Sequence, residues 1–268
     1  MNLDSTQVGI LLPALVAGLL VLATHVPLVQ QVLTRGIVFI DLAIAQVAGL
    51  GVTAADALGF EAEGWRVQVA AVAAALLGAL LLTWTEKIWP EVQEALIGVL
   101  FVVAACVELL ILANNPHGGE HLKDLLVGQI LFVSLQQLIP VAILYALALV
   151  VWFSARKIIG QIGFYILFAL VVTQSVQLVG IYLVFASLIV PALAAKRFAE
   201  PLRLVVGYVV GIAGYILGLV ASFLYDLPTG AVVVVTLLAM LILAALVAAF
   251  LPKSMRAPPA EKPLHATA

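Results

Sequence analysis

Long runs of apolar residues, separated by short polar stretches, dominate this chain from residue 8 to residue 251. Most of these runs approach the length of about 20 residues that a helix needs to cross a lipid bilayer. The predicted spans are 8–24, 36–58, 66–84, 95–113, 132–153, 160–174, 177–195, 204–225 and 227–251. The pattern predicts an all-α, polytopic membrane bundle over residues 1–251, followed by a solvated, disordered tail over 252–268.

One apolar run is too long for a single span. Residues 158–195 cover about 38 positions without a charged side chain, and one helix of that length would measure about 57 Å, nearly twice the hydrocarbon thickness. We therefore expect a turn at 173–177, where polar side chains can satisfy freed backbone groups. The bundle then has nine crossings if the run forms a hairpin, and eight if one part is re-entrant.

Charge is scarce and unevenly placed. Charged residues make up 10% of the chain, against about 25% in soluble domains, and the net charge of −2 gives no reason to expect a nucleic-acid partner. An outside N-terminus and a cytoplasmic C-terminus satisfy the positive-inside rule. In that orientation Arg35, Lys87, Arg156, Lys157, Lys196, Arg197, Arg203, Lys253, Arg256 and Lys262 fall inside, and Arg66 and Lys123 fall outside.

Two acidic residues, Asp41 and Glu108, lie within predicted spans. A carboxylate at the bilayer centre costs on the order of 3 kcal/mol, so each should face a partner or a water-filled path. Asp41 and the following Gln46 belong to an alanine-rich helix suited to lining a narrow path, with an interfacial position as the alternative for Asp41. Glu108 is interpreted as a path residue or as a hydrogen-bonded structural carboxyl. His25, before Pro27, is expected at the inner boundary of the first span.

The predicted outer loop 114–124 is rich in possible metal ligands. It contains His117, Glu120, His121 and Asp124, whose nitrogen and oxygen atoms are donors of the kind that bind zinc or manganese. The loop is interpreted either as a site that captures external metal or as a merely solvated segment. The same residues match the His-x-x-Glu-His pattern of metalloproteases. Two glycines between the histidines disfavour a helix here, so an intramembrane metalloprotease is the weaker alternative.

Three segments resemble the permeases of the zinc/manganese-type ABC importers. They are 34–41 (Thr-Arg-Gly-Ile-Val-Phe-Ile-Asp), 124–134 (ending in Gly-Gln-Ile-Leu-Phe-Val-Ser) and 179–195 (ending in Leu-Ile-Val-Pro-Ala-Leu-Ala-Ala). The resemblance covers nearly the whole chain apart from the tail. It implies a type II bundle of the cobalamin-importer kind in the bacterial inner membrane. It also implies a dimer that works with two cytoplasmic ATPase subunits and a periplasmic binding protein that delivers the metal.

The resemblance further implies a contact surface for the ATPase. Residues 191–203 correspond to the coupling helix, which docks on that partner, and Pro191 is expected to end the helix before it. The residues expected to take part in coupling are Pro191, Lys196, Arg197, Glu200 and Arg203. Anchoring of the basic residues in anionic headgroups is the alternative, and the two roles are compatible.

This chain departs from the family at the expected metal ligands. In the family, the acidic residue of the second helix is followed four positions later by His, and the resemblance implies that both bind metal. Here Ala45 stands four residues after Asp41, and Gln46 is the nearest counterpart of the His. On a regular helix Asp41 and Gln46 lie about 140° apart, and a single π-bulge would bring them together. The loss of imidazole weakens the case for zinc.

The sequence thus predicts the permease subunit of an ATP-driven importer of divalent transition metal ions, with zinc or manganese favoured. The expected metal path is formed by Asp41, Gln46 and Glu108, and no permanently bound cofactor is expected. The chain has no Gly-x-x-x-x-Gly-Lys-[Ser/Thr] loop, so ATP hydrolysis is assigned to a partner and the chain is not expected to be an enzyme. A homodimer is expected, and an ion-coupled secondary transporter is the alternative function.

Overall fold

Helices make up nearly all of the part of the chain that the computed structural model describes, namely residues 5–35, 39–60, 64–112, 118–155, 158 and 160–251. The α-helices are α1 (Ser5–Arg35), α2 (Ile40–Ala57), α3 (Trp65–Ile88), α4 (Gln93–Leu112), α5 (Gly118–Val127), α6 (Leu135–Ala155), α7 (Gly160–Val179), α8 (Ile181–Ala195), α9 (Arg203–Tyr225) and α10 (Thr229–Phe250). Short 3-10 turns are η1 (Pro90–Val92), η2 (Ile130–Phe132) and η3 (Glu200–Leu202). The predicted tail over 252–268 lies outside the described residues.

Eight of the described helices are long and apolar enough to cross a membrane, and α8 is a shorter apolar helix. At 15 residues, α8 is about 22 Å long, less than the hydrocarbon thickness of about 30 Å. Large apolar side chains such as Leu110, Phe153 and Val235 are more than 60% exposed on α4, α6 and α10. Such surfaces suit lipid, so the predicted polytopic helical bundle is confirmed.

The long apolar run turns at Gly180, and the prediction of a turn at 173–177 is wrong. Residues 173–177 lie within α7, where the Ser175 hydroxyl donates to the Val171 carbonyl at 2.8 Å. Gly180 has φ +82°, a conformation that glycine adopts without the steric cost of a Cβ. Backbone freedom at one glycine therefore decides the position of the break, rather than the polarity of the neighbouring side chains.

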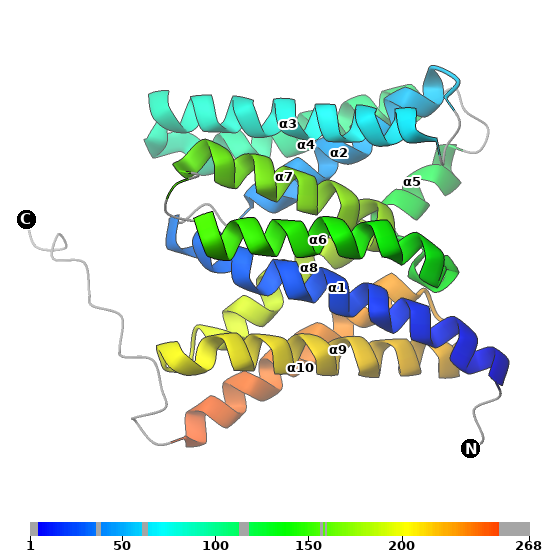
Figure 1. Ribbon diagram of the computed structural model, residues 1–268, viewed down its shortest axis with the longest axis vertical. Coiled ribbons are helices and arrows are strands. Elements are labelled where there is room, and N and C mark those ends of the chain that lie inside the picture. Colours follow the sequence, from blue (N-terminus) through cyan, green and yellow to red (C-terminus); the bar gives the residue numbers. More distant parts are fainter. Residues whose placement is uncertain are drawn as a thin grey trace, which may run out of the picture.

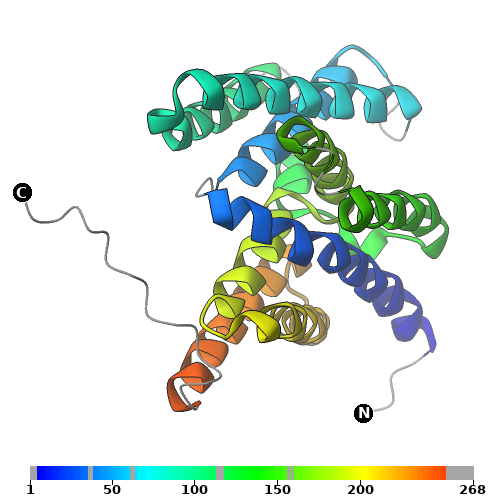
Figure 2. The same cartoon turned by 60° about the vertical axis from the view of Figure 1, so that its left-hand side comes forward.

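Figures 1 and 2 show how the helices are layered. The pair α3 and α4 lies at one edge of the molecule and the pair α9 and α10 at the opposite edge, with α1, α7 and α8 between them. The start of α1 and the short helix α5 lie at the same end of the bundle, at the right in Figure 1. The start of α9 and the end of α10 lie at the other end. The predicted topology likewise places the N-terminus and the 114–124 segment on one side and the 191–203 segment on the other. Which of the two ends faces the cytoplasm stays a prediction.

Small residues on α9 allow neighbouring helices to approach closely. A Cβ on Gly211 would lie 2.6 Å from Leu22 of α1, and one on Gly214 would lie 2.5 Å from Leu237 of α10. Gly207 and Gly218 make similar contacts with these two helices. The glycine stripe of α9 is therefore used for packing inside the bundle.

A second set of glycines joins the end of α5 to the break between α7 and α8. Gly128 has φ +74°, and a Cβ there would lie 2.2 Å from the Val179 carbonyl oxygen. A Cβ on Gly180 would lie 2.4 Å from the Gly128 backbone nitrogen, and one on Gly230 would lie 2.0 Å from the Val127 carbonyl oxygen. We call these three residues, Gly128, Gly180 and Gly230, the glycine junction. Backbones meet there at distances that no other residue type permits.

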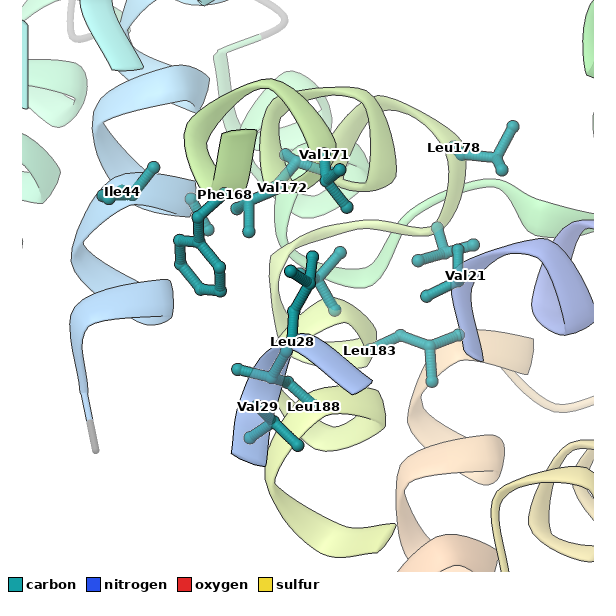
Figure 3. Close-up of a cluster of buried hydrophobic side chains, with 14 of the residues drawn as sticks. Val21, Leu28, Val29, Ile44, Phe168, Val171, Val172, Leu178, Leu183 and Leu188 are labelled. Atoms are coloured by element: carbon teal, nitrogen blue, oxygen red, sulfur yellow. The ribbon is translucent and has the colours of Figure 1, made fainter. Parts of the chain in front are cut away.

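The apolar core lies where α1, α2, α7 and α8 meet. Figure 3 shows side chains from all four helices converging there. The labelled residues are Val21, Leu28, Val29, Ile44, Phe168, Val171, Val172, Leu178, Leu183 and Leu188, all of which are buried. This core fixes α2, which carries the candidate functional residues, against the centre of the bundle.

Candidate functional site

Asp41 is a buried carboxylate whose side chain has no hydrogen-bond partner among the described residues. It is the second residue of α2 and is 0% exposed, and neither of its side-chain oxygens has a hydrogen-bond partner in the described part of the chain. Phe39, just before α2, stacks on Phe185 of α8, with ring centroids 6.2 Å apart. Asp41 is thus buried within the bundle, and its depth in the membrane stays a prediction.

Gln46 and Glu108 come together across the contact between α2 and α4. The Gln46 side-chain amide donates a hydrogen bond to Glu108 Oε2, and the Thr53 hydroxyl donates to Glu108 Oε1 at 2.8 Å. All three side chains are buried, with at most 4% exposure. We call Gln46, Thr53 and Glu108 the oxygen cluster. Within this cluster, Glu108 lies on the narrow buried stripe of α4, whose other faces are largely exposed.

The structure places Asp41 and Gln46 on different faces of α2. The helix is α-helical from Ile40 to Ala57, so the π-bulge that would bring them together is absent. Asp41 lies one turn before Ile44, which packs into the core shown in Figure 3, whereas Gln46 is turned toward α4. The three residues predicted to form one path thus fall into two groups, with Asp41 alone and Gln46 bound to Glu108.

The expected outer metal loop is partly a helix. Residues 118–127 form α5, so the prediction that the two glycines would prevent a helix is wrong. Gly118 and Gly119 occupy the first two positions of α5, where the lack of a side chain costs little, and the apolar end of the helix packs against α8. His117 lies outside the described residues. Glu120, His121 and Asp124 all belong to α5, and Asp124 is exposed.

Within the described ranges, no group of three or more His, Cys, Asp or Glu side chains is arranged to hold a metal ion. Cys106, two residues before Glu108, is exposed on α4. A closed, resident zinc site needs about four such ligands. The ionisable side chains buried in the described interior, Asp41, Glu108 and His25, do not come together as one group, an arrangement that does not provide a closed metal site.

The expected coupling segment forms a compact basic turn between α8 and α9. Lys196, Arg197 and Glu200 are exposed, while the Arg203 guanidinium donates to the Phe198 carbonyl at 3.3 Å. The prediction that Pro191 ends the helix before the turn is wrong. Pro191 lies inside α8, which continues to Ala195. Proline removes only its own backbone donor, and the following residues keep theirs, so one missing hydrogen bond is tolerated.

Sequence reasoning missed two buried polar residues. Thr53 follows Gln46 by seven positions and so lies on the same helix face, a spacing that identifies it once Glu108 is known to pack there. His25 was predicted at a helix boundary, but α1 continues through Pro27 to Arg35. His25 is 0% exposed, and its Nδ1 lies 2.9 Å from the Val21 carbonyl oxygen. The prediction of a boundary failed because α1 accommodates Pro27 without ending there.

Taken together, the apolar helices, the buried carboxylates and the basic turn at one end are those of a multi-pass membrane protein. The chain matches the ABC 3 transport family over residues 7–164 and 158–248, which is most of its length. The chain therefore belongs to the ABC 3 transport family, and the family predicted from its sequence segments is confirmed. The chain is thus a member of a transport family, which agrees with its multi-pass helical architecture.

Other proteins resemble this chain in sequence or in fold. Two relatives from Haemophilus influenzae, each described as a probable iron transport system membrane protein, are 25% identical over 182 residues and 28% identical over 156 residues. These alignments cover 60% and 50% of this chain, and 64% and 58% of the relatives' lengths. The solved structure of PsaBC from Streptococcus pneumoniae in complex with Fab has the same fold, with a TM-score of 0.69 and 20% identity. That match covers 90% of this chain and 91% of the solved one.

Proposed function

We propose that this chain is the permease subunit of an ATP-driven importer of a divalent transition metal. It would act as a homodimer with a separate cytoplasmic ATPase and a periplasmic binding protein. The observation that carries the proposal is the buried Asp41 carboxylate, which lacks a hydrogen-bond partner in the described structure. Buried structural carboxyls are normally hydrogen-bonded, and an uncompensated one inside a membrane protein is expected to serve an ion.

The proposed path uses weak and separate binding steps. The outer segment with His117, Glu120, His121 and Asp124 would capture metal from the binding protein. Asp41 would then attract the cation within the bundle, and the oxygen cluster would provide a second position. Few strong ligands along the path are an advantage, because a cation that binds too tightly is not released.

The proposed energy source is the partner ATPase, which would bind the basic turn between α8 and α9. Lys196 and Arg197 are exposed there, and α8 connects the turn directly to the core beside Asp41. Closure of an ATPase dimer against this turn would shift α8 and change which side of the path is open. Pro191, Glu200 and Arg203 would shape the turn and its contacts.

The test is the substitution Asp41→Asn, with Asp56→Asn as the matched control near the other end of α2. Metal content of cells is measured under limitation for manganese, iron and zinc, together with the amount of protein in the membrane. We expect Asp41→Asn to lower metal uptake at least about tenfold, a factor equivalent to about 1.4 kcal/mol, and Asp56→Asn to retain it. Normal uptake by the Asp41 variant would exclude the carboxylate from transport.

A second experiment tests the energy source. Vesicles containing the purified permease, with and without its ATPase, are loaded on one side with metal. ATP-dependent transport is expected only when the ATPase is present. Equal transport without any nucleotide-hydrolysing subunit would refute the proposal in favour of a secondary transporter.

A further inference from the structure

Hydrogen bonds between side chains connect a first set of helices. They join α2 to α4, α4 to α3, α3 to α7 and α7 to α6. The pairs are Gln46 and Thr53 with Glu108, Thr85 with Gln93, Glu86 with Tyr165, and Ser175 with Tyr145. We call α2, α3, α4, α6 and α7 the α2 group. Each such bond contributes only about 0.6–2 kcal/mol inside a membrane, but it is directional, so linked pairs hold these helices in one arrangement.

A second set of helices is joined in a similar way around α9. Its bonds reach α1, α8 and α10. They are Tyr208 to the Ala23 carbonyl at 3.2 Å, Tyr215 with Ser187 at 2.7 Å, Thr236 to the Gly214 carbonyl at 2.8 Å, and Ser222 with Thr229 at 2.6 Å. The glycine stripe of α9 adds close packing against α1 and α10. We call α1, α8, α9 and α10 the α9 group.

The two groups meet through apolar side chains, and we call this contact the apolar boundary. Among the side chains that the structure describes, every hydrogen bond between helices falls within one group. The core shown in Figure 3 lies between the groups. The α2 group contributes Ile44, Phe168, Val171, Val172 and Leu178, and the α9 group contributes Val21, Leu28, Val29, Leu183 and Leu188. Apolar contacts are non-directional, so packed helices can slide along them.

Asp41 lies at the apolar boundary. It shares a face of α2 with Ile44 and follows Phe39, whose ring stacks on Phe185 of α8. Its carboxylate is buried and forms no hydrogen bond with a described residue of either group. The groups can therefore move past each other without breaking a described hydrogen bond at Asp41, and such a movement changes the surroundings of the carboxylate.

The chain passes from one group to the other at Gly180, inside the glycine junction. There the backbones that end α5, separate α7 from α8 and begin α10 lie in direct contact. Such a contact has no side chains to repack, so it can stay in place as a pivot while the helices beyond it turn. The basic turn is at the far end of α8. A rotation of about 10° about the junction would carry the end of this 15-residue helix about 4 Å.

We propose that the α2 group and the α9 group are two rigid bodies, which turn about the glycine junction and slide along the apolar boundary. This inference rests on the proposed function, because the ATPase would drive the movement at the basic turn of the α9 group. It goes further by naming the helices that move together and the point about which they turn. Access to Asp41 from either side of the membrane then depends on the relative position of the two groups.

The test is to lock the apolar boundary with a disulfide and to measure ATP-dependent transport of Mn²⁺, Fe²⁺ and Zn²⁺ by the complete complex in vesicles. Gly49→Cys with Ile181→Cys places one thiol on each side, since a Cβ on Gly49 would lie 3.4 Å from Ile181 Cδ1. Every variant also carries Cys106→Ala, which removes the native cysteine of the chain. We expect oxidation to abolish transport and reduction to restore it.

Two pairs of positions within the groups are the matched controls. A Cβ on Gly78 of α3 would lie 3.6 Å from the Val47 Cβ of α2, and one on Gly207 of α9 would lie 3.1 Å from Val26 Cγ1 of α1. Both spacings are compatible with a disulfide between cysteines. Val47→Cys with Gly78→Cys, and Val26→Cys with Gly207→Cys, should therefore form disulfides on oxidation and keep the transport rate of their reduced forms.

A second measurement does not depend on disulfide formation. Spin labels on the native Cys106 of α4 and on Leu246→Cys of α10 report a distance between the groups, and labels on Cys106 and on Val150→Cys of α6 report a distance within the α2 group. All three positions are exposed. Labelled permease is diluted with unlabelled Cys106→Ala permease, and its complex with the ATPase is measured without nucleotide and with ATP and vanadate. The first distance should change by about 3 Å or more, and the second should stay constant.

Transport that is blocked equally by all three disulfides, or by none of them, would overturn the inference. A distance between the α4 and α6 labels that changes as much as the distance between the α4 and α10 labels would do the same. If a double-cysteine variant fails to assemble, the label distances decide the question. Absence of ATP-dependent transport by the unmodified complex would instead refute the proposed function itself.

Discussion

Substitution of Gly128 by alanine should destabilise the protein through two separable effects. The first is conformational, because Gly128 has φ +74°, where a residue with a Cβ loses about 1–2 kcal/mol. The second is steric, because the added Cβ would lie 2.2 Å from the Val179 carbonyl oxygen and 2.3 Å from its carbon. These are backbone atoms, so relief requires the junction between α5 and the start of α8 to open. Such overpacking typically costs about 1–3 kcal/mol.

Gly59→Ala is the control that isolates the first effect. Gly59 has φ +82°, but nothing lies within 4 Å of the position of its missing Cβ. Both variants should therefore carry the same conformational cost, and Gly128→Ala should carry an additional loss of about 2 kcal/mol. For a protein of this size that corresponds to a further drop of roughly 4–8 °C in Tm. The measurement is thermal unfolding of the purified protein in one detergent. Equal Tm values for the two variants would refute the claim that close backbone approach sets the glycine junction.

Three further results are expected. The double variant Lys196→Ala, Arg197→Ala should keep the Tm of the parent, since both side chains are exposed, but lose ATP-dependent uptake in vesicles; retained uptake would remove the basic turn from coupling. Tyr215→Phe should lower stability by about 1 kcal/mol in a thermal unfolding assay, because its hydroxyl shares a 2.7 Å hydrogen bond with α8; an unchanged Tm would show that this bond contributes nothing. The double variant His117→Ala, His121→Ala should weaken uptake only at low metal concentration, and complete loss at saturating metal would show that these histidines are essential.

Much of the fold follows from the chain's apolar runs because a membrane leaves few choices. A backbone that crosses hydrocarbon must satisfy its own hydrogen bonds, so each long apolar run becomes a helix. The prediction went wrong where one residue decided the local backbone. Gly180 set the turn that polarity had placed at 173–177, and Pro191 lay inside a helix that it was expected to end. In both places the local backbone decided the outcome, because glycine reaches the positive φ that the break needs and one missing hydrogen bond does not end α8.

The candidate site was only half visible in the sequence. Asp41 and Glu108 stood out because ionisable residues are costly in a membrane, and both are indeed buried. The hydrogen-bond partners of Glu108 were not visible in the sequence. The pairing of Gln46 with Glu108 joins residues 62 positions apart, and that of Thr53 joins residues 55 positions apart. Helical geometry could show that Asp41 and Gln46 do not share a face, but it could not show which helix Gln46 meets.

By itself, the sequence determined that this protein is a multi-pass helical bundle of the ABC 3 transport family with acidic residues inside its spans. Those properties depend on local composition, on the length of the apolar runs and on the free-energy cost of placing a charged group in a membrane, all of which can be judged from the sequence. Only the tertiary structure decided that α2 separates Asp41 from an oxygen cluster shared with α4. That division depends on how helices rotate and pack against each other. At Gly51, for example, α3 approaches α2 so closely that an added Cβ would lie 2.8 Å from the Ala74 Cβ.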